Sequence, residues 1–432
     1  LDALKALLPR YEGRVKCIYI DPPYNTGNEG WVYNDNVNDP KIKKWLGEVV
    51  GREGEDLSRH DKWLCMMYPR LKLLQKLLAE DGAIFISIDD TEYANLKLIC
   101  DEIFGSNCFV SNISWQRTYS TRNDSKGIVN EVEHLVVYSK QPGWNPNKLP
   151  RTEEMNARYK NPDNDEIPWK SSDAFAPGAS SHPGMVYAVQ HPFSGELIYP
   201  TNGRHWAFGQ DQVLEIMRGW GNYELRQIND EARRAEICGI SIEDVRHDVM
   251  AIMLTDTIEV ARTKALQIYD RGRWPLFCFS NRGKSGIRRK TYLEGVGGKL
   301  PTNLWLYSDV GHTDEAAKTL KAIFDGKATF DTPKPSRLIE RILQIAGDSE
   351  TLILDSFAGS GTTAHAVLNM NKADGGHRKF ILVEMMDYAE SITAERVRRV
   401  IRGYGEGKNA VEGTGGSFSY YELGEPLLIG EN

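Results

Sequence analysis

Short apolar runs alternate with helical patterns at both ends of the chain. Val15–Ile20 is an apolar run with β-branched residues that predicts a buried strand, and residues 83–88, after an Asp-Gly turn, predict a second. Between these runs, apolar residues recur at three- and four-residue steps over residues 63–78, and a further helical pattern covers residues 93–103. Strands that alternate with helices in this way are typical of a parallel sheet.

The alternation stops near residue 141 and resumes near residue 330. In between, Pro, Gly, Asn and aromatic residues are scattered through irregular segments, with a single charged helical stretch at residues 230–236. The later pattern predicts helices at Ser336–Ala346, 363–371 and 389–401 and strands at 351–354 and 380–383. We therefore predict an α/β fold with a doubly wound, mostly parallel sheet, built from residues 1–140 and 330–432 and interrupted by an inserted domain at residues 141–329.

Composition narrows the class of protein without selecting a function. The 432 residues are 41% hydrophobic and 26% charged, which is normal for a globular protein. No apolar run approaches the ~18 residues of a membrane span and no secretory leader opens the sequence, so we expect a cytoplasmic protein without a membrane partner. The six cysteines form no CxxC pair and the nine histidines no HExxH motif, so we expect reduced thiols and no metal site. The spacing of the first leucines indicates a helix already under way, so we expect a piece of a longer protein.

The segment Asp21-Pro22-Pro23-Tyr24 directly follows the first predicted strand. Its prolines remove two backbone donors and favour an extended exit at the carboxyl edge of the sheet, where α/β folds bind ligands. The exocyclic amine of a nucleobase is a poor nucleophile, because its lone pair is delocalised into the ring. The Asp21 carboxylate and the Pro22 carbonyl can accept the hydrogens of such an amine, and the Tyr24 ring can replace the stacking partners of a base that leaves its helix. The alternative is an ordinary proline-rich turn.

A second motif, residues 352–363, reads as a strand, a turn with Gly359 and Gly361, and the start of a helix. Glycines let a ligand approach the backbone closely. The lysine of a phosphate loop and the third glycine of a dinucleotide fingerprint are both missing, which favours a nucleoside cofactor without phosphates. Glu384, roughly 20 residues further on at the end of the next strand, can accept hydrogen bonds from ribose hydroxyls, or is simply a solvated carboxylate.

These motifs resemble those of amino-methyltransferases of the beta class. In that resemblance Asp21, Pro22 and Tyr24 are catalytic, a leading Asp implies adenine N6, and a leading Ser more often implies cytosine N4. The second motif resembles the S-adenosylmethionine-binding loop, which assigns the cofactor to Asp355, Phe357, Gly359, Gly361, Thr362 and Glu384, and Thr332-Pro333-Lys334-Pro335 resembles the short motif that precedes it. With the Pro301-Thr302-Asn303-Leu304-Trp305 segment, the wider pattern resembles the modification (Mod) subunit of type III restriction-modification systems.

The resemblance implies a Rossmann-like class I methyltransferase fold and transfer of a methyl group from S-adenosyl-L-methionine to adenine N6 of double-stranded DNA, with the target base flipped and without a metal ion. It implies a homodimer and leaves open whether a restriction subunit is a further partner. Two alternatives remain: cytosine-N4 methylation on the same fold, and a non-catalytic DNA-binding specificity subunit.

Two basic segments are candidates for the DNA-facing surface. Residues 271–299 carry eight basic residues against Glu294 alone, a local charge of +7 on a chain of −7, interleaved with Trp274, Phe277, Phe279 and Tyr292. This mixture predicts phosphate contacts with stacking aromatic residues, the alternative being a solvated basic loop with core aromatics. The weaker candidate is the segment that contains Trp115, Gln116, Arg117 and Tyr119 and continues to Arg122 and Lys126. We expect this segment to cover the flipped base.

Overall fold

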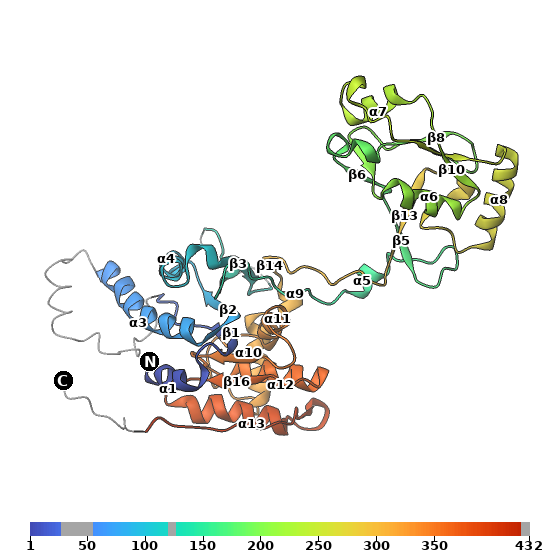
Figure 1. Ribbon diagram of the computed structural model, residues 1–432. Helices are drawn as coiled ribbons and strands as arrows, with labels where there is room; N and C mark the ends of the chain where they lie inside the picture. Colours follow the sequence, from blue (N-terminus) through green and yellow to red (C-terminus); the bar gives the residue numbers. More distant parts are fainter. Residues whose placement is uncertain (27–54, 120–126, 425–432) are drawn as a thin grey trace. The chain divides into compact units, whose positions relative to one another are not determined.

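The computed structural model describes residues 1–26, 55–119 and 127–424, and it divides into two compact units. Unit 1 combines residues 1–149 with 299–432, and unit 2 consists of residues 150–298. The two ends of the inserted unit meet at Leu149 and Lys299, which form an antiparallel bridge in which each N–H donates to the opposite carbonyl at 2.8 Å. Unit 1 is therefore one body built from both ends of the chain, coloured blue to cyan and orange to red in Figure 1.

A seven-stranded sheet, with the order β14-β3-β4-β2-β1-β15-β16, forms the centre of the described part of unit 1. Only β4 runs antiparallel to its neighbours, so the predicted mostly parallel α/β sheet is confirmed. In the middle of the sheet, Ile18 of β1 lies opposite Ile84 of β2 on one side and Leu354 of β15 on the other. The strands are β1 (Val15–Ile20), β2 (Leu78–Ile88), β3 (Phe109–Gln116), β4 (Val132–Ser139), β14 (Leu304–Trp305), β15 (Leu352–Asp355) and β16 (Lys379–Leu382).

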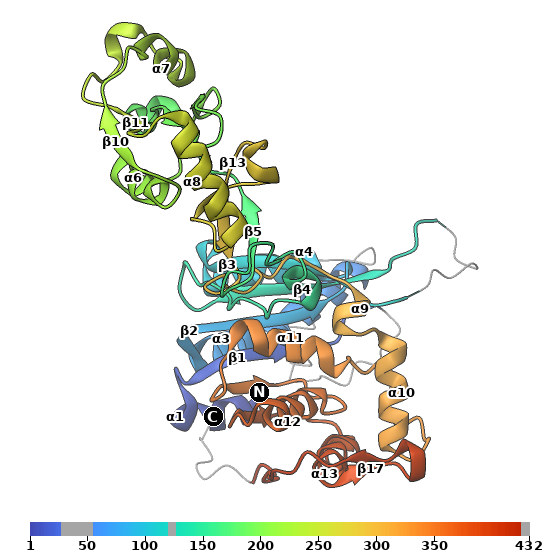
Figure 2. The ribbon, with the colours of Figure 1, turned by 90° about the vertical axis from the view of Figure 1, so that its right-hand side faces the viewer.

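Helices cover both faces of this sheet, because alternate residues of each strand point to opposite sides. One face packs against α1 (Asp2–Tyr11), α3 (Glu55–Leu77) and α4 (Tyr93–Phe104). The other packs against α11 (Ser336–Ala346), whose apolar residues recur at helical spacing, and α12 (Thr362–Asp374). Figure 2 shows α11 beside β1 and β2. Near β16, α10 (Thr313–Ile323) and α13 (Glu395–Arg402) complete the core, and the short α9 (Tyr307–Val310), β17 (Gly403–Tyr404) and β18 (Val411–Glu412) lie in the same unit.

Unit 2 contains more regular structure than the sequence pattern predicted. In place of a single helical stretch it has α6 (Gln210–Arg218), α7 (Glu231–Cys238) and α8 (Ile258–Arg271), besides the short α5 (Glu153–Asn156). Its three sheets are β10-β11-β7-β8, β12-β13-β5 and β6-β9. Their strands are β5 (Trp169–Ser172), β6 (Phe175–Pro177), β7 (Val189–Gln190), β8 (Leu197–Ile198), β9 (Arg204–Trp206), β10 (Tyr223–Arg226), β11 (Ala251–Leu254), β12 (Phe277–Phe279) and β13 (Ile287–Tyr292). Strands of two to six residues are too short to produce a clear alternation in the sequence, which explains the error.

The structural boundaries of the insertion also differ from the predicted ones. Residues 141–149 and 299–329 belong to unit 1, where β14 pairs with β3 and α10 contributes Leu320 and Ile323 to the core. A two-residue strand gives almost no periodic signal, so the prediction placed the end of the insertion too late. None of the helices in the described residues is long and apolar enough to span a membrane.

Candidate active site

The two sequence motifs meet at the carboxyl edge of the sheet. Because β1 and β15 are parallel neighbours, the segments that follow them leave the sheet at the same edge. A cavity of about 210 Å³ lies between these segments. Eight of the nine predicted site residues line it: Asp21, Pro22, Tyr24, Asp355, Phe357, Gly359, Thr362 and Glu384. A larger cavity, of about 410 Å³, lies near the amino ends of the strands and is lined by Lys16, Asp81 and Asp348 among others, away from both motifs.

The Asp21–Tyr24 segment is anchored to the helical layer behind it. The Nε1–H of Trp63, a buried residue of α3, donates to the Pro23 carbonyl at 2.7 Å. The Tyr24 ring packs against the edge of the same core cluster. The exit from β1 is therefore fixed by a hydrogen bond as well as by its two prolines.

Asp21 and Tyr24 belong to a compact group of polar and charged side chains drawn from four segments of the chain. The Lys334 ammonium donates to both Asp21 carboxylate oxygens at 2.7 Å. The Tyr24 hydroxyl lies 2.9 Å from Asp21 Oδ1 and 3.1 Å from Glu133 Oε2, on β4. Lys334 Nζ lies 3.6 Å from that same Glu133 oxygen, and Arg117 donates to the other at 3.1 Å.

Burial and charge act in opposite directions on this group. Burial raises the pKa of Asp21 above its usual value, and the adjacent Lys334 ammonium opposes that rise. Burial alone would lower the pKa of Lys334, but the carboxylates of Asp21 and Glu133 outweigh burial and raise it. Lys334 is therefore a cation with two carboxylates beside it, and its side chain is only 10% exposed.

The turn after β15 is closed by its own side chains. The buried Asp355 carboxylate accepts the Phe357 N–H at 3.1 Å and the Thr363 hydroxyl at 2.6 Å, and burial raises the pKa of Asp355 to about 7. Gly359 has a φ of +51°, and a Cβ there would lie 3.1 Å from Phe330 Cζ. Gly361, at the start of α12, has a φ of +81° and lies outside the residues that line the cavity. Both glycines adopt the left-handed conformation, which other residues avoid.

Glu384 lies beyond the end of β16 and faces the same turn. Its carboxylate accepts the backbone N–H groups of Gly359, Met385 and Met386 at 2.8, 2.9 and 3.1 Å. An ionised carboxylate offers about four acceptor positions, so this arrangement leaves room for about one more donor. Burial raises the pKa of Glu384 above its usual value.

A buried guanidinium supports the turn from behind. Arg396, on α13, donates from one nitrogen to the Ser360 and Thr362 hydroxyls at 2.8 Å and contacts His365 Nδ1 with another at 3.1 Å. The Thr362 hydroxyl in turn donates to the Lys334 carbonyl at 3.2 Å. Sequence reasoning missed Arg396, Glu133 and Trp63, which no motif marks. Lys334 lay inside a recognised motif but was not assigned to the site.

Comparison with known proteins identifies the family of the chain. A family model described as "DNA methylase", covering N6 and N4 methylases, matches residues 15–215 and 258–395. The chain belongs to this DNA methylase family.

The curated relatives of this family member are modification enzymes. The type III restriction-modification enzyme StyLTI Mod subunit of Salmonella typhimurium is 33% identical over 88% of this chain and 50% of its own length. The EcoPI Mod subunit of Escherichia phage P1 is 31% identical over 89% of this chain and 56% of its own length. The type II methyltransferase M.KpnI of Klebsiella pneumoniae is 30% identical over 85% of this chain and 74% of its own length. The chain thus spans about half the length of the Mod subunits it matches.

Solved structures give a weaker likeness. A putative DNA modification methylase of Thermus thermophilus, TTHA0409, in complex with S-adenosyl-L-methionine, aligns over 92% of both chains at 13% identity with a TM-score of 0.37. The PvuII DNA methyltransferase, described as cytosine-N4-specific, aligns over 91% of this chain and 83% of its own at 13% identity with a TM-score of 0.38. These values are too low to add to the sheet order observed directly.

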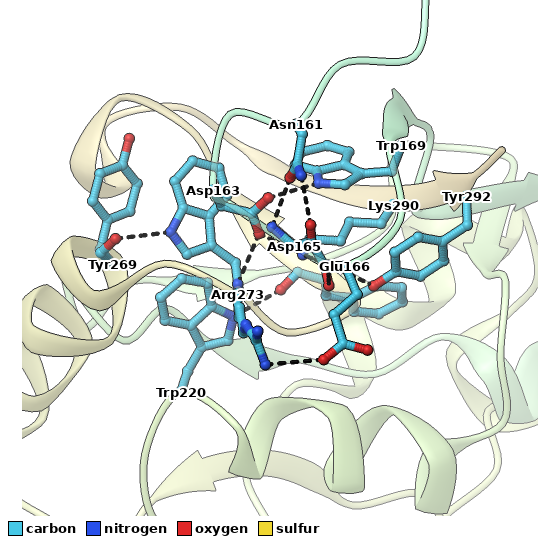
Figure 3. A network of polar contacts seen from close by, with 12 residues as sticks. Asn161, Asp163, Asp165, Glu166, Trp169, Trp220, Tyr269, Arg273, Lys290 and Tyr292 are labelled. Carbon is cyan, nitrogen blue, oxygen red and sulfur yellow. Dashed lines mark hydrogen bonds and ion pairs between the residues drawn. The ribbon is translucent and has the colours of Figure 1, made fainter. Parts of the chain in front are cut away.

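In this DNA methylase family member, the aromatic part of the predicted DNA-facing segment is core. Phe277 and Phe279 are fully buried and Trp274 nearly so, because β12 is covered on both faces. Lys290 is buried as well, in ion pairs with Asp163 and Asp165 (Figure 3). The prediction that Trp274, Phe277 and Phe279 stack on DNA is therefore wrong, and for them the alternative of core aromatics holds, whereas Tyr292 is only partly buried. Other cations of the segment are exposed, including Arg273 and Arg282, which pair with Glu166 and Asp270.

The weaker candidate segment is only partly at the site. Trp115 is buried and donates its Nε1–H to the Gly311 carbonyl at 3.0 Å, so it is a core residue. Arg117 reaches the catalytic group through Glu133, and Tyr119 is exposed. Arg122 and Lys126 lie outside the described residues.

Proposed function

We propose that this chain carries the catalytic part of a DNA methyltransferase that transfers a methyl group from S-adenosylmethionine to N6 of adenine. The observation that carries the proposal is the cavity in which the Asp21–Tyr24 segment faces the glycine turn between β15 and α12. The DNA methylase family and the Mod relatives support the substrate class. The leading Asp of the motif supports adenine over cytosine.

The residues around the glycine turn fit a nucleoside cofactor. Gly359 has no side chain where the turn faces the cavity, so a ligand can approach the backbone. Phe357 and Tyr388 provide apolar lining, and Glu384 retains about one acceptor position for a hydroxyl. We propose that these residues hold S-adenosylmethionine, which supplies an electrophilic methyl group activated by its sulfonium charge.

The hydrogen bonds that Asp21 already accepts indicate how it can bind the target amine. Of about four acceptor positions on an ionised carboxylate, Lys334 takes one on each oxygen and Tyr24 takes the second on Oδ1. The remaining position is on Oδ2, where an N–H of the target amine can donate while the Pro22 carbonyl accepts the other hydrogen. Both contacts localise the lone pair of the amine. The Tyr24 ring, held by its hydroxyl, offers a face for the flipped base.

Unit 2 has its own core, so we propose it as a separate target-recognition module on double-stranded DNA. We also propose a homodimer and a restriction subunit as further partners, and the relatives that are Mod subunits of restriction-modification enzymes support the second of these.

The test uses labelled S-adenosylmethionine and unmethylated bacterial DNA, followed by digestion of the product to nucleosides. We expect labelled N6-methyladenosine from the parent and none from Asp21→Ala. Asp81→Asn, near the opposite edge of the sheet, is the matched control and keeps the activity. Labelled N4-methylcytosine would refute adenine as the target. A chain that neither binds S-adenosylmethionine nor transfers a methyl group would favour the non-catalytic specificity subunit.

A further inference from the structure

Two carboxylates share one hydroxyl at the candidate active site. Asp21 Oδ1 and Glu133 Oε2 both lie within about 3 Å of the Tyr24 hydroxyl oxygen, at 2.9 and 3.1 Å. The Glu133 side chain is only 8% exposed and that of Asp21 26% exposed. Burial raises the pKa of Asp21, and the negative charge of the nearby Glu133 raises it further, so both disfavour the ionised form of Asp21. A protonated Asp21 would lose an acceptor that the target amine requires.

Lys334 lies where its positive charge can offset the negative charges of both carboxylates. Its ammonium donates to both oxygens of Asp21 at 2.7 Å and lies 3.6 Å from Glu133 and 5.0 Å from the centre of the Tyr24 ring. An ammonium carries three donors, so two can serve Asp21 while the third points toward Glu133. Arg117 satisfies the remaining Glu133 oxygen at 3.1 Å, and the two cations balance the two carboxylates.

We propose that Lys334 and Glu133 are positioning residues for the methyl transfer: Lys334 holds the Asp21 carboxylate ionised and in one orientation, and Glu133 holds Lys334 and the Tyr24 hydroxyl in place. This inference rests on the proposed function. It adds two residues that no sequence motif assigned to the chemistry, and it gives each a separate task.

The backbone of Lys334 links this group to the cofactor turn. Its carbonyl accepts the Thr362 hydroxyl at 3.2 Å, and Thr362 is the first residue of α12. Pro333 and Pro335 on either side restrict the local backbone, which limits the freedom of the lysine stem. One residue therefore contacts the catalytic carboxylate through its side chain and the glycine turn through its main chain, so the two halves of the site are held at a fixed distance.

The test compares the pH dependence of single-turnover methyl transfer in four proteins: the parent, Lys334→Met, Glu133→Gln and the double variant. Lys334→Met leaves two carboxylates on one hydroxyl, so the acid limb of the rate profile moves up by about one pH unit or more, with activity partly recovered at high pH. Glu133→Gln removes the like charge, so its acid limb moves down. The double variant has neither the like charge nor the cation, and its acid limb returns toward that of the parent. Besides each other, the titrating and charged groups of the described residues that act on Glu133 or Asp21 are Tyr19, Tyr24, Asp89, Arg117, Lys334 and Asp355.

Two controls separate this inference from the proposed function and from misfolding. Lys327→Met, at an exposed lysine in the same segment, keeps the parent profile. In cofactor-free protein, the carboxyl ¹³C resonance of Asp21, assigned with Asp21→Asn, titrates at higher pH in Lys334→Met than in the parent. This second readout needs no activity, so it tests the charge pairing even where no methyl transfer occurs.

A loss of rate in Lys334→Met with an unshifted acid limb and an unchanged Asp21 titration would overturn the inference, while N6-methyladenosine from the parent would leave the proposed function standing. A double variant whose acid limb stays with that of Lys334→Met would also overturn it. Lys334→Gln, which keeps a polar side chain of similar length, repeats the measurement if the methionine variant does not fold.

Discussion

The buried ion pairs of unit 2 allow a quantitative test of what holds that unit together. Lys290, on β13, has a side chain with no solvent exposure and donates to Asp163 at 2.5 Å and to Asp165 at 2.6 Å (Figure 3). The Asp163 side chain is also fully buried, whereas that of Asp165 is 17% exposed. We predict that Lys290→Met destabilises unit 2 by about 3–5 kcal/mol, the usual cost of leaving a buried charge without its partner.

The magnitude follows from what Asp163 retains after the change. Its carboxylate still accepts the Nε1–H of Trp169 and the backbone N–H of Trp274, both at 2.8 Å, so its hydrogen bonds are largely preserved. The counter-charge alone is lost, and methionine fills most of the lysine volume. The double variant Lys290→Met/Asp163→Asn removes both charges, so we expect it to recover much of the lost stability.

Hydrogen exchange of the full chain, followed by mass spectrometry, measures this locally. Peptides that cover β5 and β13 should exchange about 10²- to 4 × 10³-fold faster in Lys290→Met, since each 1.4 kcal/mol is tenfold in the opening equilibrium. Arg273→Met, which breaks an exposed pair with Glu166, is the matched control and should exchange almost as the parent does. Parent-like exchange in Lys290→Met would refute the reasoning. A double variant as unstable as the single one would show that packing, not charge, is responsible.

Three further changes test individual steps of the argument. Gly359→Ala places a Cβ 3.1 Å from the Phe330 ring at a φ of +51°. We expect this variant to lose about 1–2 kcal/mol of stability in thermal unfolding and to bind the cofactor more weakly in calorimetry. A variant with the stability of the parent would contradict the expected strain. Burial raises the pKa of Asp355 to about 7, whereas its pKa in the unfolded chain is about 3.9. Its contribution to the free energy of unfolding is therefore full below pH ~4 and declines by about 1.4 kcal/mol per pH unit as the pH rises to ~7. In denaturant titrations Asp355→Asn should lack this decline, and the same pH dependence of stability in both proteins would count against the reasoning. Phe279→Ala should cost unit 2 about 3–5 kcal/mol because the ring is core, and a variant that weakens DNA binding without losing stability would restore the stacking hypothesis.

The sequence pattern predicted β1, β2, β15 and β16 and the segments that follow β1 and β15, but not β3, β4 and β14. Each motif directly follows a short apolar run, and runs of this kind form the buried central strands β1 and β15. Because parallel neighbours end at the same edge, the Asp21–Tyr24 segment and the glycine turn had to meet once both strands were correct. Local pattern and topology point to the same arrangement here, which explains why eight of nine predicted residues line one cavity.

Local pattern failed where a side chain's role depends on a distant partner. Lys290 contributed to the local positive charge that suggested DNA contact, but its charge is neutralised by Asp163, 127 residues away. Lys334 lies 313 residues from Asp21, and Glu133 lies 109 residues from Tyr24. Composition within a window records the charge of a residue but not its burial or its counter-ion. Neither the buried residues of the basic segment nor the group around Asp21 could therefore be separated from solvated charges by sequence alone.

The placement of the insertion explains how one sheet can be interrupted by about 150 residues without disturbing its active site. Every described residue that lines the 210 Å³ cavity belongs to unit 1. Unit 2 is entered at Leu149 and left at Lys299, which are hydrogen-bonded to each other, so the chain leaves and rejoins unit 1 at a single point beyond β4 and before the edge strand β14. An inserted segment whose two ends lie side by side restricts the conformation of its host unit very little. The hydrogen bonds and ion pairs that join Asp21, Tyr24, Glu133 and Lys334 all lie within unit 1, so we expect sequence changes in the core of unit 2 to leave this group in place.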